Sequence, residues 1–244
     1  MIGSSRRVPL IVFSGLDGSG KSTQVELLRE RLEARGLETA VVWTRLEWTT
    51  LWESAALLER IAAPVNWLLG RGRREGAREP GAPVDAGTMF TPGSATTPAG
   101  RLRRRSALLT HAWVFVVAAI HATAQRRTVR AAARPGTVVL CDRYTLDAAV
   151  ALRRRYGERR SFALQTRLLG LLSPRPLVAW HLDATPMLVK QRKDEGFSDE
   201  ELSRLAALYS EERERLGWRR LDATRPAAEL AEEIAQATEA ALDS

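Results

Sequence analysis

The chain has 244 residues, 45% hydrophobic and 27% charged, which is typical of soluble globular proteins and excludes collagen-like, coiled-coil and wholly disordered chains. Its single cysteine, Cys141, cannot form an internal disulfide, so we expect a cytoplasmic protein rather than a disulfide-stapled secreted one. The net charge is +8, but residues 71–105 alone contribute eight arginines against three acids, and no readout motif accompanies them, so nucleic acid is an unlikely partner.

Apolar runs and helical spacings alternate along the chain. The apolar or β-branched runs predict strands at residues 8–13, 38–44, 137–141, 177–183 and 218–222. The helical spacings predict a helix that ends at Gly36 and helices at about 51–63, 104–134, 145–154, 162–172, 185–193, 199–216 and 227–242. Strands that alternate with helices predict an α/β fold, a five-stranded parallel sheet with helices on both faces, in a single domain over residues 1–244.

Two segments differ from this alternation of strands and helices, one by its lack of periodicity and the other by its apolar composition. Residues at about 70–103 are rich in glycine, proline and arginine without periodicity, and we expect a mobile insertion there. The most apolar stretch, Leu108 to Ile120, is interrupted by Thr110 and His111 and falls short of the roughly 18 to 20 apolar residues of a membrane span. We therefore expect a buried helix and no membrane span.

The clearest motif lies between the first strand and the first helix. Residues 15–22 read GLDGSGKS and fit G-x-x-x-x-G-K-[ST] in the strand–loop–helix context that this motif requires. Its glycines let backbone N–H groups converge on phosphate oxygens, Lys21 brings a charge to the β- and γ-phosphates, and the Ser22 hydroxyl can ligate Mg²⁺. The alternative, a tight turn with an incidental lysine, is disfavoured by that context. The predicted nucleotide-binding residues are Gly15, Leu16, Asp17, Gly18, Ser19, Gly20, Lys21, Ser22 and Thr23.

With this loop the chain resembles the thymidylate kinase family of P-loop nucleoside monophosphate kinases. The resemblance covers both ends of the chain in four ordered matches. They are Asp17 in the loop, Asp142-Arg143-Tyr144 after the third strand, HLDATPMLVKQRKDE from the fourth strand onward, and Asp222-Ala223-Thr224-Arg225-Pro226 after the last strand.

The resemblance implies a kinase that uses ATP and Mg²⁺ and acts on a small phosphorylated acceptor, and it leaves a homodimer open. Asp17 would face the acceptor or metal-bound water, Arg143 would hold the acceptor phosphate, and Asp142 would orient Mg²⁺ through water. Arg192, with Lys193, would meet transition-state charge from a short lid at about 190–198. For Arg192 and Lys193 a solvated helix face is an equal alternative. Arg225 would bind ATP, and Arg45, Phe115 and Tyr144 would join Asp17 and Arg143 around the acceptor.

The middle of the chain departs from the family. The Thr-Arg-Glu-Pro-Gly-Gly stretch of the family is reduced to Thr44-Arg45, with Glu47 nearby, and Ala119 stands where the family has an arginine one turn after its aromatic residue. Either the acceptor is not thymidylate or the pocket is rebuilt, with Trp43, Trp48, Trp52 and Trp113 as candidates that fit a core role as well. Three functions stay open: a thymidylate kinase-like enzyme, a kinase of another phosphorylated metabolite such as a sugar or lipid-linked precursor, and a non-catalytic ATP-binding regulator.

Overall fold

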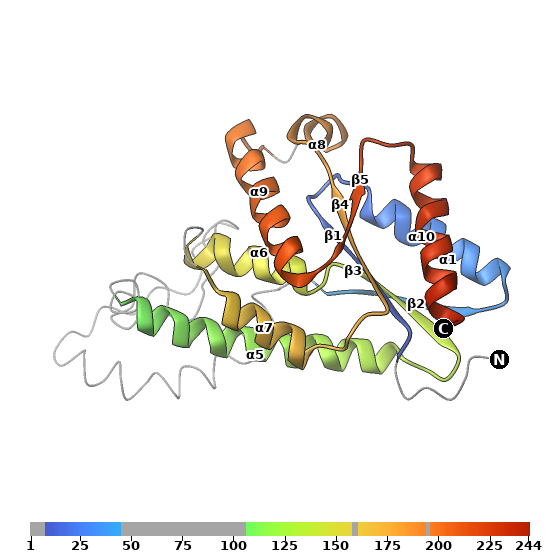
Figure 1. The fold of residues 1–244 in the computed structure, drawn as a ribbon, viewed down its shortest axis with the longest axis horizontal. Coiled ribbons are helices and arrows are strands. Elements are labelled where there is room, and N and C mark those ends of the chain that lie inside the picture. Colours follow the sequence, from blue (N-terminus) through green and yellow to red (C-terminus); the bar gives the residue numbers. More distant parts are fainter. Residues whose placement is uncertain (1–7, 45–105, 158–160, 194–195) are drawn as a thin grey trace, which may run out of the picture.

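The computed structural model describes residues 8–44, 106–157, 161–193 and 196–244 (Figure 1). The helix expected at about 51–63 and the insertion expected at about 70–103 lie outside these residues. The two ends of the described chain, at the start of β1 and the end of α10, lie at the same side of the molecule in Figure 1.

The described residues contain a five-stranded sheet in the order β2-β3-β1-β4-β5, in which every neighbouring pair is parallel. The strands are β1 (Leu10–Gly15), β2 (Glu38–Trp43), β3 (Thr137–Asp142), β4 (Val178–Asp183) and β5 (Arg219–Asp222). The parallel α/β sheet predicted from the alternation of elements is therefore confirmed. Each strand lies within about two residues of its predicted bounds.

Helices cover both faces of this sheet (Figure 1). They are α1 (Lys21–Ala34), α5 (Ala107–Ala132), α6 (Thr145–Tyr156), α7 (Ala163–Leu172), α8 (Pro186–Arg192), α9 (Asp199–Leu216) and α10 (Ala227–Leu242). Helices α1 and α10 pack together on one face, while α5, α6 and α9 contact the other and α7 packs on α5 and α6. Because both faces are covered, the central strands β1 and β3 carry continuous runs of buried residues.

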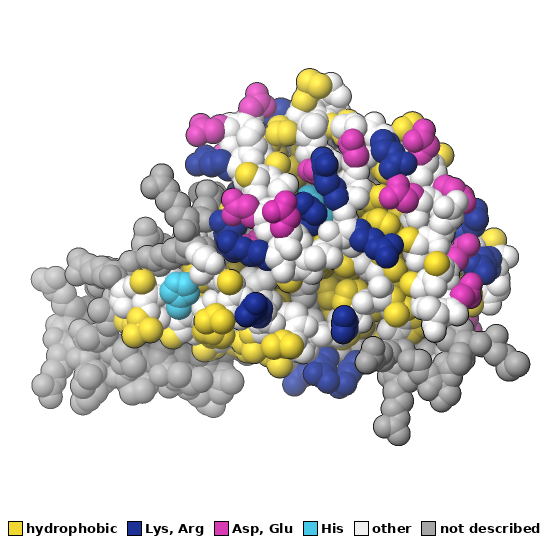
Figure 2. All heavy atoms as spheres, viewed as in Figure 1, with side chains coloured by type: hydrophobic (Ala, Val, Ile, Leu, Met, Phe, Trp, Pro, Cys, Tyr) yellow, Lys and Arg dark blue, Asp and Glu magenta, His cyan; other side chains and the backbone are white. Residues whose placement is uncertain are grey.

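The interior has two apolar clusters. The larger lies between the sheet and its helices and contains the wholly buried Leu10, Ile11, Val12 and Phe13 of β1. The smaller is formed by α5, α6 and α7. Figure 2 shows hydrophobic side chains along the outer side of α5 and α7. Three leucines of these helices, Leu108, Leu164 and Leu171, are 79%, 63% and 81% exposed.

Helix α5 contains the apolar stretch noted in the sequence. It has 26 residues and a mean hydropathy of 1.6 in its most apolar window, so among the described residues it is the one helix long and apolar enough to cross a membrane. Length and composition are weak evidence, because core helices of soluble proteins share them. Here α5 packs on α7, α6 and β2 and buries polar side chains that bond to other elements, among them Gln125. The expected burial of this stretch is therefore met only in part, because a third of the most apolar window is buried (33%).

Candidate functional site

The phosphate loop joins the end of β1 to the start of α1. Gly15, Gly18 and Gly20 have φ angles of 150°, 82° and 97°, a region that side chains with a Cβ rarely occupy. A Cβ on Gly15 would lie 2.5 Å from the carbonyl oxygen of Leu182 in β4, and one on Gly18 would lie 3.2 Å from that of Val189 in α8. The glycines therefore let the loop curl against β4 and α8 and lead into the N-terminus of α1, where backbone N–H groups favour an anionic ligand.

Lys21 is the first residue of α1 and is buried inside the loop. Its Nζ donates hydrogen bonds to the carbonyl oxygens of Gly15, at 3.0 Å, and Leu16, at 2.7 Å, and lies 3.9 Å from Asp17 Oδ1. Burial lowers the pKa of Lys21, while the nearby carboxylates, Asp147 foremost, oppose that shift. The ammonium group is thus held at the centre of the loop, where an anionic ligand would complete its coordination.

Ser22 and Asp142 form an oxygen-rich pair at the carboxyl ends of the central strands. Ser22 Oγ donates to Asp142 Oδ2 at 2.8 Å, while Asp142 Oδ1 is buried and has no hydrogen-bond partner among the described residues. Hard cations such as Mg²⁺ prefer hydroxyl, carboxylate and water oxygens, so this pair fits a Mg²⁺ site in which water supplies further ligands. The described residues contain no cluster of three or more His, Cys, Asp or Glu side chains suited to a metal ion.

Arg143 follows β3 in a left-handed backbone conformation, with a φ of 70°. Its N–H donates to the carbonyl oxygen of Phe13 at 2.8 Å, which extends the ladder between β1 and β3 and fixes this conformation. The guanidinium forms ion pairs with Asp17 and, at 3.4 Å, with Asp147. Burial alone would lower the pKa of Arg143, but the charges of Asp147 and Asp17 outweigh it and raise the pKa.

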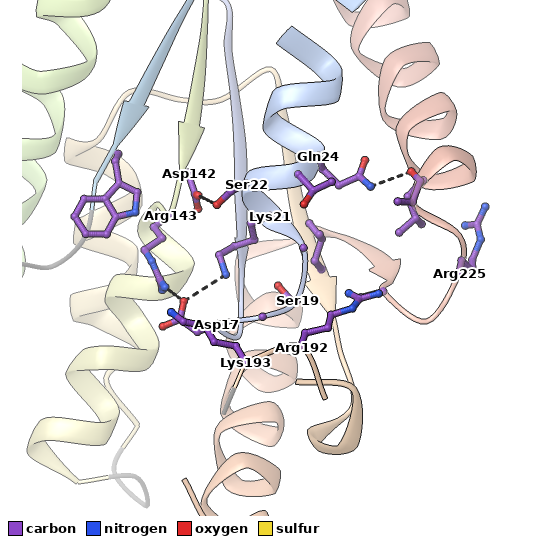
Figure 3. A pocket seen from close by; sticks show the side chains of 18 residues that line it. Asp17, Ser19, Lys21, Ser22, Gln24, Asp142, Arg143, Arg192, Lys193 and Arg225 are labelled. Carbon is purple, nitrogen blue, oxygen red and sulfur yellow. Dashed lines mark hydrogen bonds and ion pairs between the residues drawn. The ribbon is translucent and has the colours of Figure 1, made fainter. Parts of the chain in front are cut away.

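These groups face one cavity of about 580 Å³ (Figure 3). In Figure 3, Lys21 and Arg143 both point toward Asp17, while Arg192 and Lys193 approach from α8. The predicted site residues that line the cavity are Asp17, Gly18, Ser19, Gly20, Lys21, Ser22, Thr23, Asp142, Arg143, Arg192, Lys193 and Arg225. The structure therefore gathers segments from residues 17 to 225 around one space, with Gly15 and Leu16 forming the base of the loop.

Two of the expected acceptor residues, Tyr144 and Phe115, lie in the described part of the chain and do not line the cavity. Tyr144 is buried, and its hydroxyl donates to the carbonyl oxygen of Pro174 at 2.6 Å, beside a second, smaller cavity. Phe115 lies on α5 and does not line the main cavity. Arg45, Glu47, Trp48 and Trp52 lie outside the described residues. The residues expected around the acceptor therefore fall only partly within the described part of the chain.

The tryptophan candidates separate clearly. Trp43, at the end of β2, lines the cavity and is 50% exposed. Trp113 belongs to the α5–α6 interface, where its Nε1 donates to the Tyr156 hydroxyl at 3.0 Å. Trp43 is therefore placed to contact a ligand, and Trp113 is a partly buried residue that packs against the smaller apolar cluster.

Two polar residues of the site had not been singled out from the sequence. Gln24 lines the cavity one turn into α1, and its Nε2 donates to the carbonyl oxygen of Ala227 at 3.0 Å. Asp147 pairs with Arg143 from within α6. Because Arg143 precedes α6 in a left-handed conformation, the rule that side chains at i and i+4 meet on a helix does not apply to this pair and gave no signal. Nothing local marked Gln24.

A parallel α/β sheet with a phosphate loop after its first strand is consistent with a P-loop kinase-like fold. Over 31 residues the chain is 61% identical to a thymidylate kinase of Afipia carboxidovorans, a match that spans 13% of this chain and 14% of that relative. No family model matches the chain. The short match suggests a nucleotide kinase and leaves the acceptor undefined.

Proposed function

We propose that this protein is an ATP- and Mg²⁺-dependent kinase that transfers the γ-phosphoryl group of ATP to a nucleoside monophosphate, in the manner of thymidylate kinases. The observation that carries the proposal is that Lys21, in a phosphate loop, and Arg143, directly after the neighbouring strand β3, line one cavity. The two cations suit two phosphate groups, one on the donor and one on the acceptor.

The donor end is formed by the loop and α1. Backbone N–H groups of the loop and the N-terminus of α1 favour the phosphates of ATP, and Lys21 would exchange its bonds to the Gly15 and Leu16 carbonyls for phosphate oxygens. Ser22 and, through water, Asp142 would hold Mg²⁺, which when bound neutralises charge between the β- and γ-phosphates. Arg225 lies on the α10 side of the cavity, where it would contact ATP.

Between the two ends, an oxygen of the acceptor phosphate would attack the γ-phosphorus and ADP would leave. Such a reaction depends on positioning and charge stabilisation rather than on a protein nucleophile. Arg143 would align the acceptor phosphate, while Arg192 and Lys193 would stabilise the equatorial oxygens from α8. The segment at about 190–198 would act as the short lid that carries them, within a single domain.

A second candidate is a kinase of the same mechanism with another small phosphorylated acceptor, such as a sugar or lipid-linked precursor. It is favoured by a specific observation: two of the five expected acceptor residues, Phe115 and Tyr144, do not line the cavity, whereas Trp43 does. A regulatory protein without turnover has no comparable support, because phosphate binding alone requires neither Arg143 nor Arg192.

The test is coupled ADP release from ATP and Mg²⁺ over a panel of thymidylate, other nucleoside monophosphates and sugar phosphates. We expect ADP release to depend on one acceptor and a phosphorylated product to form in equal amount. The Lys21→Ala variant and a reaction without acceptor are the controls. ATP binding without turnover on any acceptor would contradict the kinase and leave the regulatory alternative.

A further inference from the structure

Arg143 lies between two carboxylates of different character. Its Nη2 contacts Asp17 in the phosphate loop, and its Nη1 faces Asp147 Oδ1 at 3.4 Å. The Asp17 side chain is 30% exposed, whereas that of Asp147 is 6% exposed. One side of the guanidinium is therefore paired within the cavity and the other side within the protein interior.

The carboxylate of Asp147 is fixed by two donors besides Arg143. Its Oδ2 accepts the backbone N–H of Tyr144 at 3.0 Å, and its Oδ1 accepts the hydroxyl of Tyr209 at 2.8 Å. A carboxylate with both oxygens bonded has little freedom to rotate, and charged hydrogen bonds of this kind are stronger than neutral ones. Asp147 thus offers Arg143 a partner whose position is set by α6 and α9 together.

Tyr209 comes from α9, which packs on α6, so its hydroxyl bridges the two helices (Figure 1). Its ring lies stacked on the imidazole of His181 in β4, with 5.5 Å between centroids and 5° between planes. Burial, with the Asp147 charge, raises the pKa of Tyr209 well above its ordinary value, so the hydroxyl remains a donor. Burial lowers the pKa of His181 to about 4, so the ring beneath Tyr209 stays uncharged near neutral pH.

We propose that Asp147 and Tyr209 are positioning residues that hold the Arg143 guanidinium for the acceptor phosphate. The proposal rests on the kinase function and adds two residues to it. Arginine side chains are long and lose considerable rotamer freedom when they bind a ligand. The fixed Asp147 retains Nη1, and the exposed Asp17 is the partner that an acceptor phosphate would replace at Nη2. The guanidinium is therefore oriented before the acceptor arrives.

The most selective test is Tyr209→Phe, which keeps the ring on His181 and removes the hydroxyl. We expect the acceptor KM to rise about tenfold and kcat to fall, with the KM for ATP within twofold of wild type, because a lost hydrogen bond to a charged group has about this effect. Asp147→Asn should give a larger change in the same direction. The assay uses, as acceptor, the compound that gives the highest turnover in the panel of nucleoside monophosphates and sugar phosphates described above.

Tyr156→Phe is the matched control. Tyr156 is also a buried tyrosine at the α5–α6 interface, where its hydroxyl accepts from Trp113, and it does not line the cavity. The control should lose thermal stability like Tyr209→Phe while both KM values stay near wild type. Equal kinetics in the two variants, or an equal loss for ATP and acceptor, would overturn the positioning role while leaving the kinase intact.

A double-mutant cycle measured by thermal unfolding separates this inference from the kinase function. It compares Tyr209→Phe, Arg143→Ala and the double variant, none of which needs turnover to be measured. If Tyr209 acts through the Asp147–Arg143 pair, the Tm loss of the double variant is smaller than the sum of the two single losses. That result without turnover on any acceptor would reject the kinase and retain only the coupling of Tyr209 to Arg143 through Asp147. Additive Tm losses would show that Tyr209 does not act on Arg143 and would reject the positioning role.

Discussion

The two ends of the cavity, the proposed donor end at the phosphate loop and the proposed acceptor end at Arg143, are built in different ways. At the donor end, the loop's internal bonds join near neighbours: Lys21 bonds to Gly15 and Leu16, and the Ser19 N–H donates to the Leu16 carbonyl oxygen at 3.1 Å. At the acceptor end, the partners of Arg143 include Asp17, which lies 126 residues away along the chain. A phosphate loop is therefore a local structure, whereas the acceptor end depends on packing between distant segments.

A hydrogen-bonded chain beneath Arg143 shows the same dependence. The Thr44 hydroxyl donates to the Arg143 carbonyl oxygen at 2.6 Å, Gln125 Nε2 donates to that hydroxyl at 3.0 Å, and the Ser173 hydroxyl donates to Gln125 Oε1 at 2.8 Å. Residues after β2, within α5, after β3 and after α7 thus meet at one point. Changes in the helices far from the loop can therefore alter the acceptor end while the donor end keeps its form.

The largest expected effect is at the donor end. Lys21→Ala should lower kcat by on the order of 1000-fold and weaken ATP binding, since it removes the charge held against the β- and γ-phosphates. Coupled ADP release and ATP titration measure both quantities. Arg126→Ala, an exposed cation on α5 outside the cavity, should match wild type. Turnover near the wild-type rate in Lys21→Ala would contradict the proposal that the loop binds the phosphates of ATP.

Arg143→Ala tests the acceptor end. We expect kcat/KM for the acceptor to fall about 100-fold, through a higher KM and a lower kcat, because a charged contact to the acceptor phosphate and its transition state is lost. The KM for ATP should stay within a few-fold of wild type. Steady-state kinetics with each substrate varied in turn measure this split. A loss shared equally by ATP and acceptor would show that the two ends are not separate.

The need for glycine in the loop can be tested through stability. Gly15→Ala should destabilise the protein by about 3 kcal/mol, because the new Cβ would lie 2.5 Å from the Leu182 carbonyl oxygen. Gly36→Ala is the control: its φ is 77° and, apart from its chain neighbours, no described residue has an atom within 4 Å of the new Cβ, so only about 1 kcal/mol is expected. Urea unfolding gives both values. Equal losses would mean that backbone conformation alone, and not the approach of β4, requires glycine.

The smallest expected effect concerns Cys141, directly before Asp142. Burial raises the pKa of Cys141 to about 12, although its hydrogen bond with Thr44 partly opposes this. Since the thiolate is the reactive form, the native protein should resist a thiol reagent such as DTNB at pH 8 and react once unfolded. With one cysteine in the chain, the absorbance reports this site alone. Rapid reaction of the native protein would show that the acceptor end opens to solvent.

The sequence alone determined the sheet and the phosphate loop. Continuous apolar runs such as Leu10–Phe13 predict buried parallel strands, because a strand covered on both faces has no polar side. Residues 15–22 predict their own loop, because glycine spacing and the following helix are local properties. The resemblance also predicted Asp142, Arg143, Arg192 and Arg225, which the structure gathers around the cavity.

Only the tertiary structure decided which side chains face the acceptor end. Tyr144 adjoins Arg143 in the sequence yet bonds to Pro174 away from the main cavity, because Arg143 adopts a left-handed backbone conformation before α6 begins. Trp43 lines the cavity, while Trp113 packs against the smaller apolar cluster, although both are tryptophans. Tyr209 meets Asp147 across 62 residues because α9 packs on α6. Side-chain direction at such places is fixed by how helices pack on the sheet, and that packing has no local signature in the chain.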